Sequence, residues 1–124
     1  MPKLRNASVE AHRTAVESSM ADAAAFLQDA LGQQLVGYMA GLSDAKAVGR
    51  WASGARAPRP ETQRRLRDAQ YIFRLLVTEE SPRTVRAWFV GLNPQLDDES
   101  PATAIREGRT RDALVAAKAF LAGG

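Results

Sequence analysis

Lys46 and Arg50 lie four positions apart in a segment whose pattern predicts a short helix, so we expect both side chains on one face. Basic side chains placed this way can reach the O6 and N7 atoms of guanine from the major groove of DNA. Arg56 and Arg59 follow in a predicted loop, where arginine suits contacts with backbone phosphates. This stretch of the chain is therefore a candidate nucleic-acid contact.

The charge around this pair favours the same interpretation. The chain has 124 residues and a formal net charge of +3, which alone is a weak sign of an anionic partner. Between residues 46 and 67, however, only Glu61 opposes the basic side chains. Arg64, Arg65 and Arg67 span nearly a full helical turn, so at most two of them can face DNA. We expect the third at the surface or paired with Asp68. The basic side chains are Lys46, Arg50, Arg56, Arg59, Arg64, Arg65 and Arg67.

Catalytic and metal-binding patterns are not found. His12 is the single histidine, the chain has no cysteine, and there is no glycine-rich phosphate loop. The acids of residues 97–99 are better explained by the positive start of a following helix than by a metal site. We expect a protein that is not an enzyme, with no cofactor, no metal and no small-molecule substrate.

The apolar composition predicts a small helical protein that works with a partner chain. Hydrophobic residues make up 45% of the sequence, and many are alanines, which favour helix but bury little area. We therefore expect a homodimer or a larger hetero-oligomer. No stretch approaches the roughly 20 apolar residues of a membrane helix, and no signal-peptide segment begins the chain, so we expect a cytoplasmic protein without a membrane contact.

The elements that must position these residues are all expected to be helices. Capping serines followed by proline mark two starts, at Ser81 and Ser100; Ser43 or Asp44 is expected to cap another, and Thr110 the last. We divide the chain into an N-terminal helix with a possible dimer contact (1–31), a helix-turn-helix region (32–78) and a C-terminal helical region (79–124). The expected helices are 9–31, 33–40, about 43–52, 60–77, 81–90, 100–107 and 110–121.

Residues 33–67 have the pattern of a helix-turn-helix, which needs a short helix, a tight turn and a second helix laid across the first. Val48 and Trp51 are three residues apart and should both point inward, leaving Lys46 and Arg50 outside. The sequence from Val48 through Trp51 and Gly54 to Pro58 resembles the end of the recognition helix in Xre-type, phage-repressor-like proteins. That resemblance implies an all-α fold and operator binding by two copies.

A second resemblance covers the C-terminal region. Residues 86–96 contain a tryptophan helix and the turn Leu92-Asn-Pro94-Gln-Leu96, and residues 100–108 contain Ser-Pro-Ala-Thr-Ala-Ile-Arg-Glu-Gly. This order is similar to the toxin-binding segment of Xre/MbcA/ParS antitoxins, whose partners are RES-domain toxins that degrade NAD. The resemblance implies a type II antitoxin that binds a toxin encoded next to it and represses its own operon.

Two sets of site residues follow from these resemblances. The residues expected at DNA are Ser43, Asp44, Ala45, Lys46, Arg50, Arg56, Arg59 and Arg64. The residues expected at the toxin are Trp88, Phe89, Arg109, Arg111, Lys118, Phe120, Leu121 and Gly124, with one member of the Trp88–Phe89 pair in the core.

Two alternatives stay open. One is a stand-alone transcriptional regulator whose C-terminal helices only dimerise. The other is a protein-interaction module that has lost DNA binding, because Ala45, Ala47 and Gly49 stand where polar side chains would read bases.

Overall fold

The computed structural model describes residues 19–123, and its regular elements are α-helices with one short 3-10 helix. The expected all-α fold is confirmed. The start of the first predicted helix lies outside the described residues, and the described part runs from residue 19 to 31. The remaining elements are α2 (Gln33–Met39), α3 (Lys46–Ala52), α4 (Pro60–Leu76), α5 (Pro82–Val90), η1 (Pro94–Leu96), α6 (Pro101–Arg106) and α7 (Thr110–Leu121).

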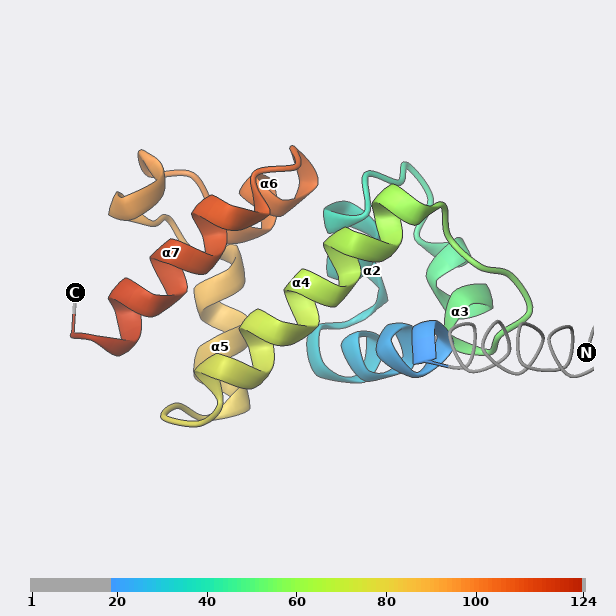
Figure 1. The fold of residues 1–124 in the computed structure, drawn as a ribbon, viewed down its shortest axis with the longest axis horizontal. Helices are drawn as coiled ribbons and strands as arrows, with labels where there is room; N and C mark the ends of the chain where they lie inside the picture. Colours follow the sequence, from blue (N-terminus) through green and yellow to red (C-terminus); the bar gives the residue numbers. More distant parts are fainter. Residues whose placement is uncertain (1–18, 124) are drawn as a thin grey trace, which may run out of the picture.

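Helix α4 is the central element of the fold. It has 17 residues, and it runs from the end of the molecule that carries α2 and α3 to the end that carries α5 (Figure 1). Helix α7 lies alongside α4 and runs in the same direction, while α6 packs against α2 (Figure 1). The helix-turn-helix and the C-terminal helices therefore share one long support.

One hydrophobic core spans residues from all three predicted segments. Helix α4 contributes Leu66, Ile72 and Leu76, each at most 1% exposed. Helix α7 contributes mainly alanines to this core, and small side chains allow two helices to approach closely. The other large, fully buried side chains are Met20, Leu27, Val36, Met39, Val48, Val85, Phe89, Pro101 and Ile105.

The two serine caps expected from the sequence are present. The Ser81 Oγ accepts a hydrogen bond from the Thr84 amide at 3.2 Å, and the Ser100 Oγ accepts one from the Thr103 amide at 3.0 Å. The cap expected at Thr110 is wrong, because Thr110 is the first helical residue of α7 and Arg109 precedes it without a side-chain cap. The backbone amide of Arg109 is already used in closing α6, at 2.7 Å from the Ala104 carbonyl.

Candidate DNA and partner interfaces

The turn between α2 and α3 is closed by the backbone. The amide of Gly41 donates to the Tyr38 carbonyl and the amide of Leu42 donates to the Gly37 carbonyl, both at 3.0 Å. This pair of bonds needs a left-handed residue after the helix, and Gly41 supplies it with a φ of 82°. Inside α2, Gly37 lies against Ala45, where an added Cβ would come within 2.9 Å of the Ala45 Cβ. The absence of a side chain at Gly37 therefore sets how closely α3 is seated on α2.

Helix α3 has the two faces that the sequence predicts. Val48 is 0% exposed and Trp51 is 6% exposed, whereas Lys46 and Arg50 are exposed on the opposite face. The helix begins at Lys46, whose amide donates to the Asp44 Oδ1 at 3.0 Å. Of the two caps expected from the sequence, Asp44 rather than Ser43 provides this bond, although the residue at the cap position itself is Ala45.

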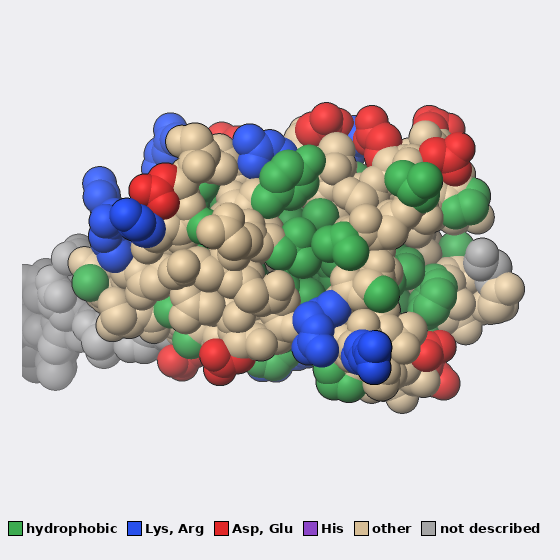
Figure 2. Space-filling model, turned by 180° about the vertical axis from the view of Figure 1, so that it is seen from behind, with side chains coloured by type: hydrophobic (Ala, Val, Ile, Leu, Met, Phe, Trp, Pro, Cys, Tyr) green, Lys and Arg blue, Asp and Glu red, His purple; other side chains and the backbone are tan. Residues whose placement is uncertain are grey.

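The other residues expected at DNA occupy two different environments. Ser43, Arg56 and Arg59 are exposed near α3. Neither Arg56 nor Arg59 forms an ion pair with a described acid. Ala45 is partly buried against α2, so its methyl group helps to seat the helix. Lys and Arg side chains cluster at the end of the molecule that carries α3 (Figure 2).

The three arginines in the first half of α4 make different contacts. Arg65 pairs with Glu61 at 2.7 Å rather than with Asp68, and Arg67 donates to the Ser19 Oγ at 3.3 Å. Arg64 is exposed and lines a depression together with Gly108 and Thr110 of the α6–α7 turn. Arg64 therefore belongs to the α7 side of α4.

Helices α2 and α6 are joined by a clamp that the sequence analysis missed. The Arg106 Nη1 donates to the Tyr38 carbonyl at 2.7 Å, and its guanidinium lies 4.6 Å from the centre of the Tyr38 ring. The Tyr38 hydroxyl also lies 2.9 Å from the Thr103 Oγ1, which in turn lies 2.9 Å from the Ser100 Oγ. This chain of contacts connects the first helix of the helix-turn-helix to the cap of α6.

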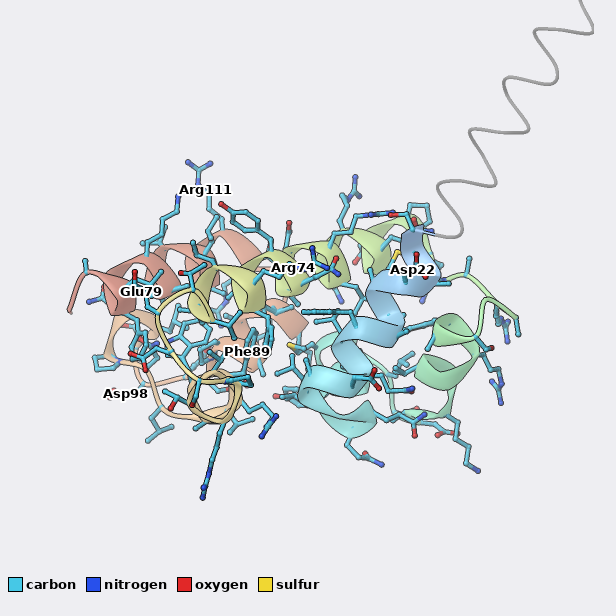
Figure 3. The ribbon with its side chains drawn as sticks, turned by 90° about the horizontal axis from the view of Figure 1, so that it is seen from below. Asp22, Arg74, Glu79, Phe89, Asp98 and Arg111 are labelled. Carbon is cyan, nitrogen blue, oxygen red and sulfur yellow. The ribbon has the colours of Figure 1, made fainter. Side chains whose placement is uncertain are left out.

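Most residues expected at a toxin lie on or near α7. Phe89 is 0% exposed, and Figure 3 places it inside the helical body, so it is the core member of its pair. Trp88 is partly buried between Phe89 and Phe120, with ring centres 5.2 Å and 6.5 Å away. Leu121 is partly buried and Gly124 lies outside the described residues.

The guanidinium of Arg109 is paired with acidic side chains of its own chain. It forms ion pairs with Glu99 and with Glu107, the latter at 2.6 Å. The hydrogen bonds that Arg109 donates to Glu107 and Glu99 raise the pKa of Arg109 above its usual value. Glu99 therefore holds Arg109 in place, a role that the sequence analysis did not assign to the acids of residues 97–99.

Arg111 and Lys118, by contrast, are exposed and line a groove between α4 and α7. The groove has a volume of about 390 Å³, and side chains from both helices form its walls. Arg111 points away from the body on this side of the molecule (Figure 3). The lining residues are Asp68, Tyr71, Ile72, Thr110, Arg111, Leu114, Val115 and Lys118.

Comparison with solved structures identifies this architecture. The chain is similar to a chain in the crystal structure of the M. tuberculosis MbcT–MbcA toxin–antitoxin complex, with a TM-score of 0.70 and 23% sequence identity. The match covers 83% of this chain and 94% of that one. The chain has the MbcA antitoxin-like fold. No family model matches the sequence, and no curated protein matches it.

Two residues of the groove, Tyr71 and Val115, were not expected from the sequence. Tyr71 and Val115 are each 56% exposed, and they face the groove from α4 and α7. Neither belongs to the buried stripe of its own helix, so helical periodicity could only place them outside the core.

In the range 19–123, no helix is long and apolar enough to cross a membrane, and no group of three potential metal ligands is found.

Proposed function

We propose that this chain is the antitoxin of a type II toxin–antitoxin pair, which binds a RES-domain, NAD-degrading toxin and represses its own operon through the helix-turn-helix. The observation that carries the DNA-binding half is the orientation of α3. Val48 and Trp51 are buried, and Lys46 and Arg50 are exposed beside the basic loop that follows. This arrangement leaves a short basic helix free to enter a major groove.

The toxin-binding half is supported by the MbcA-like fold and by the sequence motifs of α5 to α7. The similar solved chain comes from a toxin–antitoxin complex. In this chain, the tryptophan helix, the Asn93–Pro94 turn and the Ser100–Pro101 start form α5, η1 and α6 in that order. The identity of the toxin as a RES-domain protein rests on the resemblance of these motifs.

Operator binding is tested by gel shift or fluorescence anisotropy on the promoter of its own operon. The double variant Lys46→Ala/Arg50→Ala should lose at least about tenfold in affinity, because each base-edge contact contributes about 1–3 kcal/mol. Arg83→Ala removes an exposed cation of α5 and serves as the matched control. Equal affinities of the double variant and the wild type would refute the assignment of α3 to the groove.

Toxin binding is tested by co-purification with the product of the neighbouring gene and by rescue of cellular NAD. Removal of residues 110–124 would be a poor test, because Ala113, Ala116 and Ala117 of α7 lie in the core. The full chain should form a stable complex and preserve NAD on co-expression. Operator binding without any toxin capture would instead favour the stand-alone regulator.

A further inference from the structure

The groove between α4 and α7 has the chemistry of a docking site. Its walls are two stripes at helical spacing: residues 68, 71 and 72 of α4, and residues 111, 114, 115 and 118 of α7. The middle of the groove is apolar, with Tyr71 and Val115 each 56% exposed above the buried Ile72. Aromatic and aliphatic side chains left half exposed at one place are typical of interaction surfaces.

The rim of this groove is positively charged. Arg111 and Lys118 stand on α7 at exposed positions, and neither forms an ion pair with a described acid. A second depression of about 290 Å³ shares Asp68 and Thr110 with the groove and extends it toward Arg64. Together the two linings carry four cations (Arg64, Arg65, Arg111 and Lys118) against two acids (Glu61 and Asp68).

The charge distribution selects the kind of occupant. A second copy placed symmetrically on this groove would bring two surfaces with the same excess of positive charge together, which is unfavourable. Nucleic acid would satisfy the rim but would leave Tyr71 and Val115 without apolar neighbours. A protein segment with apolar side chains in its middle and acids along its edge complements both features.

We propose that the α4–α7 groove binds an acidic, amphipathic segment of the toxin. This inference rests on the proposed function and adds the surface and the chemistry of the partner. The apolar side chains of the segment cover Tyr71 and Val115, and its acids face Arg111 and Lys118. The adjoining depression brings the same segment close to Arg64.

Two valine variants provide a matched test. Val115 and Val90 are 56% and 59% exposed on helices, but only Val115 lines the groove. We expect Val115→Glu to raise the Kd for the purified toxin at least about tenfold, whereas Val90→Glu leaves it within about twofold of the wild type. Circular dichroism and thermal unfolding check that both variants keep the fold, as their exposure predicts.

A charge variant tests the second half of the proposal. Arg111→Glu/Lys118→Glu should weaken toxin binding mainly through the association rate and should reduce its dependence on salt. Retained toxin affinity in both the valine and the charge variant would overturn the inference, as would a loss confined to Val90→Glu. A change only in the oligomeric state of the isolated chain, or only in operator affinity, would assign the groove to a second copy or to DNA and overturn it too. A wild-type chain that fails to bind the toxin would refute the proposed function itself.

Discussion

Replacing Gly37 by alanine should destabilise the helix-turn-helix, although the same change usually stabilises a helix. In the interior of a helix, alanine is favoured over glycine by about 1 kcal/mol. At Gly37, however, the new Cβ would lie 2.9 Å from the Ala45 Cβ and 3.0 Å from the Ala45 Cα. Carbon atoms pack best at about 3.5–4.0 Å, so α2 and α3 would have to separate by roughly 0.5–1 Å.

The magnitude follows from opposing these two effects. Overpacking of this kind costs about 1–3 kcal/mol, and here the opposing atoms include backbone, which cannot rotate away. We therefore take the upper part of this range, about 2–3 kcal/mol, and after subtracting the helix-propensity gain of about 1 kcal/mol we expect a net destabilisation of about 1–2 kcal/mol. For a chain of 124 residues this corresponds to a decrease in Tm of roughly 3–10 °C.

Gly49→Ala provides the matched control within the same motif. The Cβ added at Gly49 would meet the Gln33 Nε2 at 3.1 Å, which is the far end of a flexible side chain. Gly49→Ala should therefore stabilise the protein by up to about 1 kcal/mol. Urea and thermal unfolding followed by circular dichroism measure both variants. A Gly37→Ala protein at least as stable as Gly49→Ala would refute the claim that a close backbone approach seats α3.

Two further predictions concern the junction between α2 and α6. Ser100→Ala should lower the free energy of unfolding by about 1–2 kcal/mol. This loss should exceed that of Ser81→Ala, because Ser100 is less exposed and the Thr103 hydroxyl that it bonds also contacts the Tyr38 hydroxyl of α2. Equal losses in chemical denaturation would contradict this ranking. Arg106→Ala should cost about 1–2 kcal/mol by removing the bond to the Tyr38 carbonyl and the stacking on its ring. An unchanged denaturation midpoint for Arg106→Ala would show that this clamp does not stabilise the fold.

Much of the fold could be predicted because local signals and periodicity agree. Ser81–Pro82 and Ser100–Pro101 specify helix starts through side-chain caps and proline geometry, which depend only on neighbouring residues. The spacing of Val48 and Trp51 likewise determined the buried face of α3, and the structure confirms it. Such features need no knowledge of which helices pack together.

Features that join distant segments were not predictable in this way. The Arg106–Tyr38 clamp links residues 68 positions apart, and nothing in either local pattern indicates the other. Arg64 lines a depression together with Gly108 of the α6–α7 turn, and this closeness of α4 to a distant turn could not be read from the local pattern; its contact with DNA stays a prediction. The groove itself arises only when α7 is laid along α4.

Because α4 lies in one undivided core, both proposed activities depend on the stability of the same core. Its buried side chains are covered on one side by the helix-turn-helix and on the other by α7, which supplies Ala113, Ala116 and Ala117. Loss of α7 would expose Ile72 to water and would remove one wall of the core that α4 shares with the helix-turn-helix. Unfolding of the free chain would therefore abolish both proposed activities together.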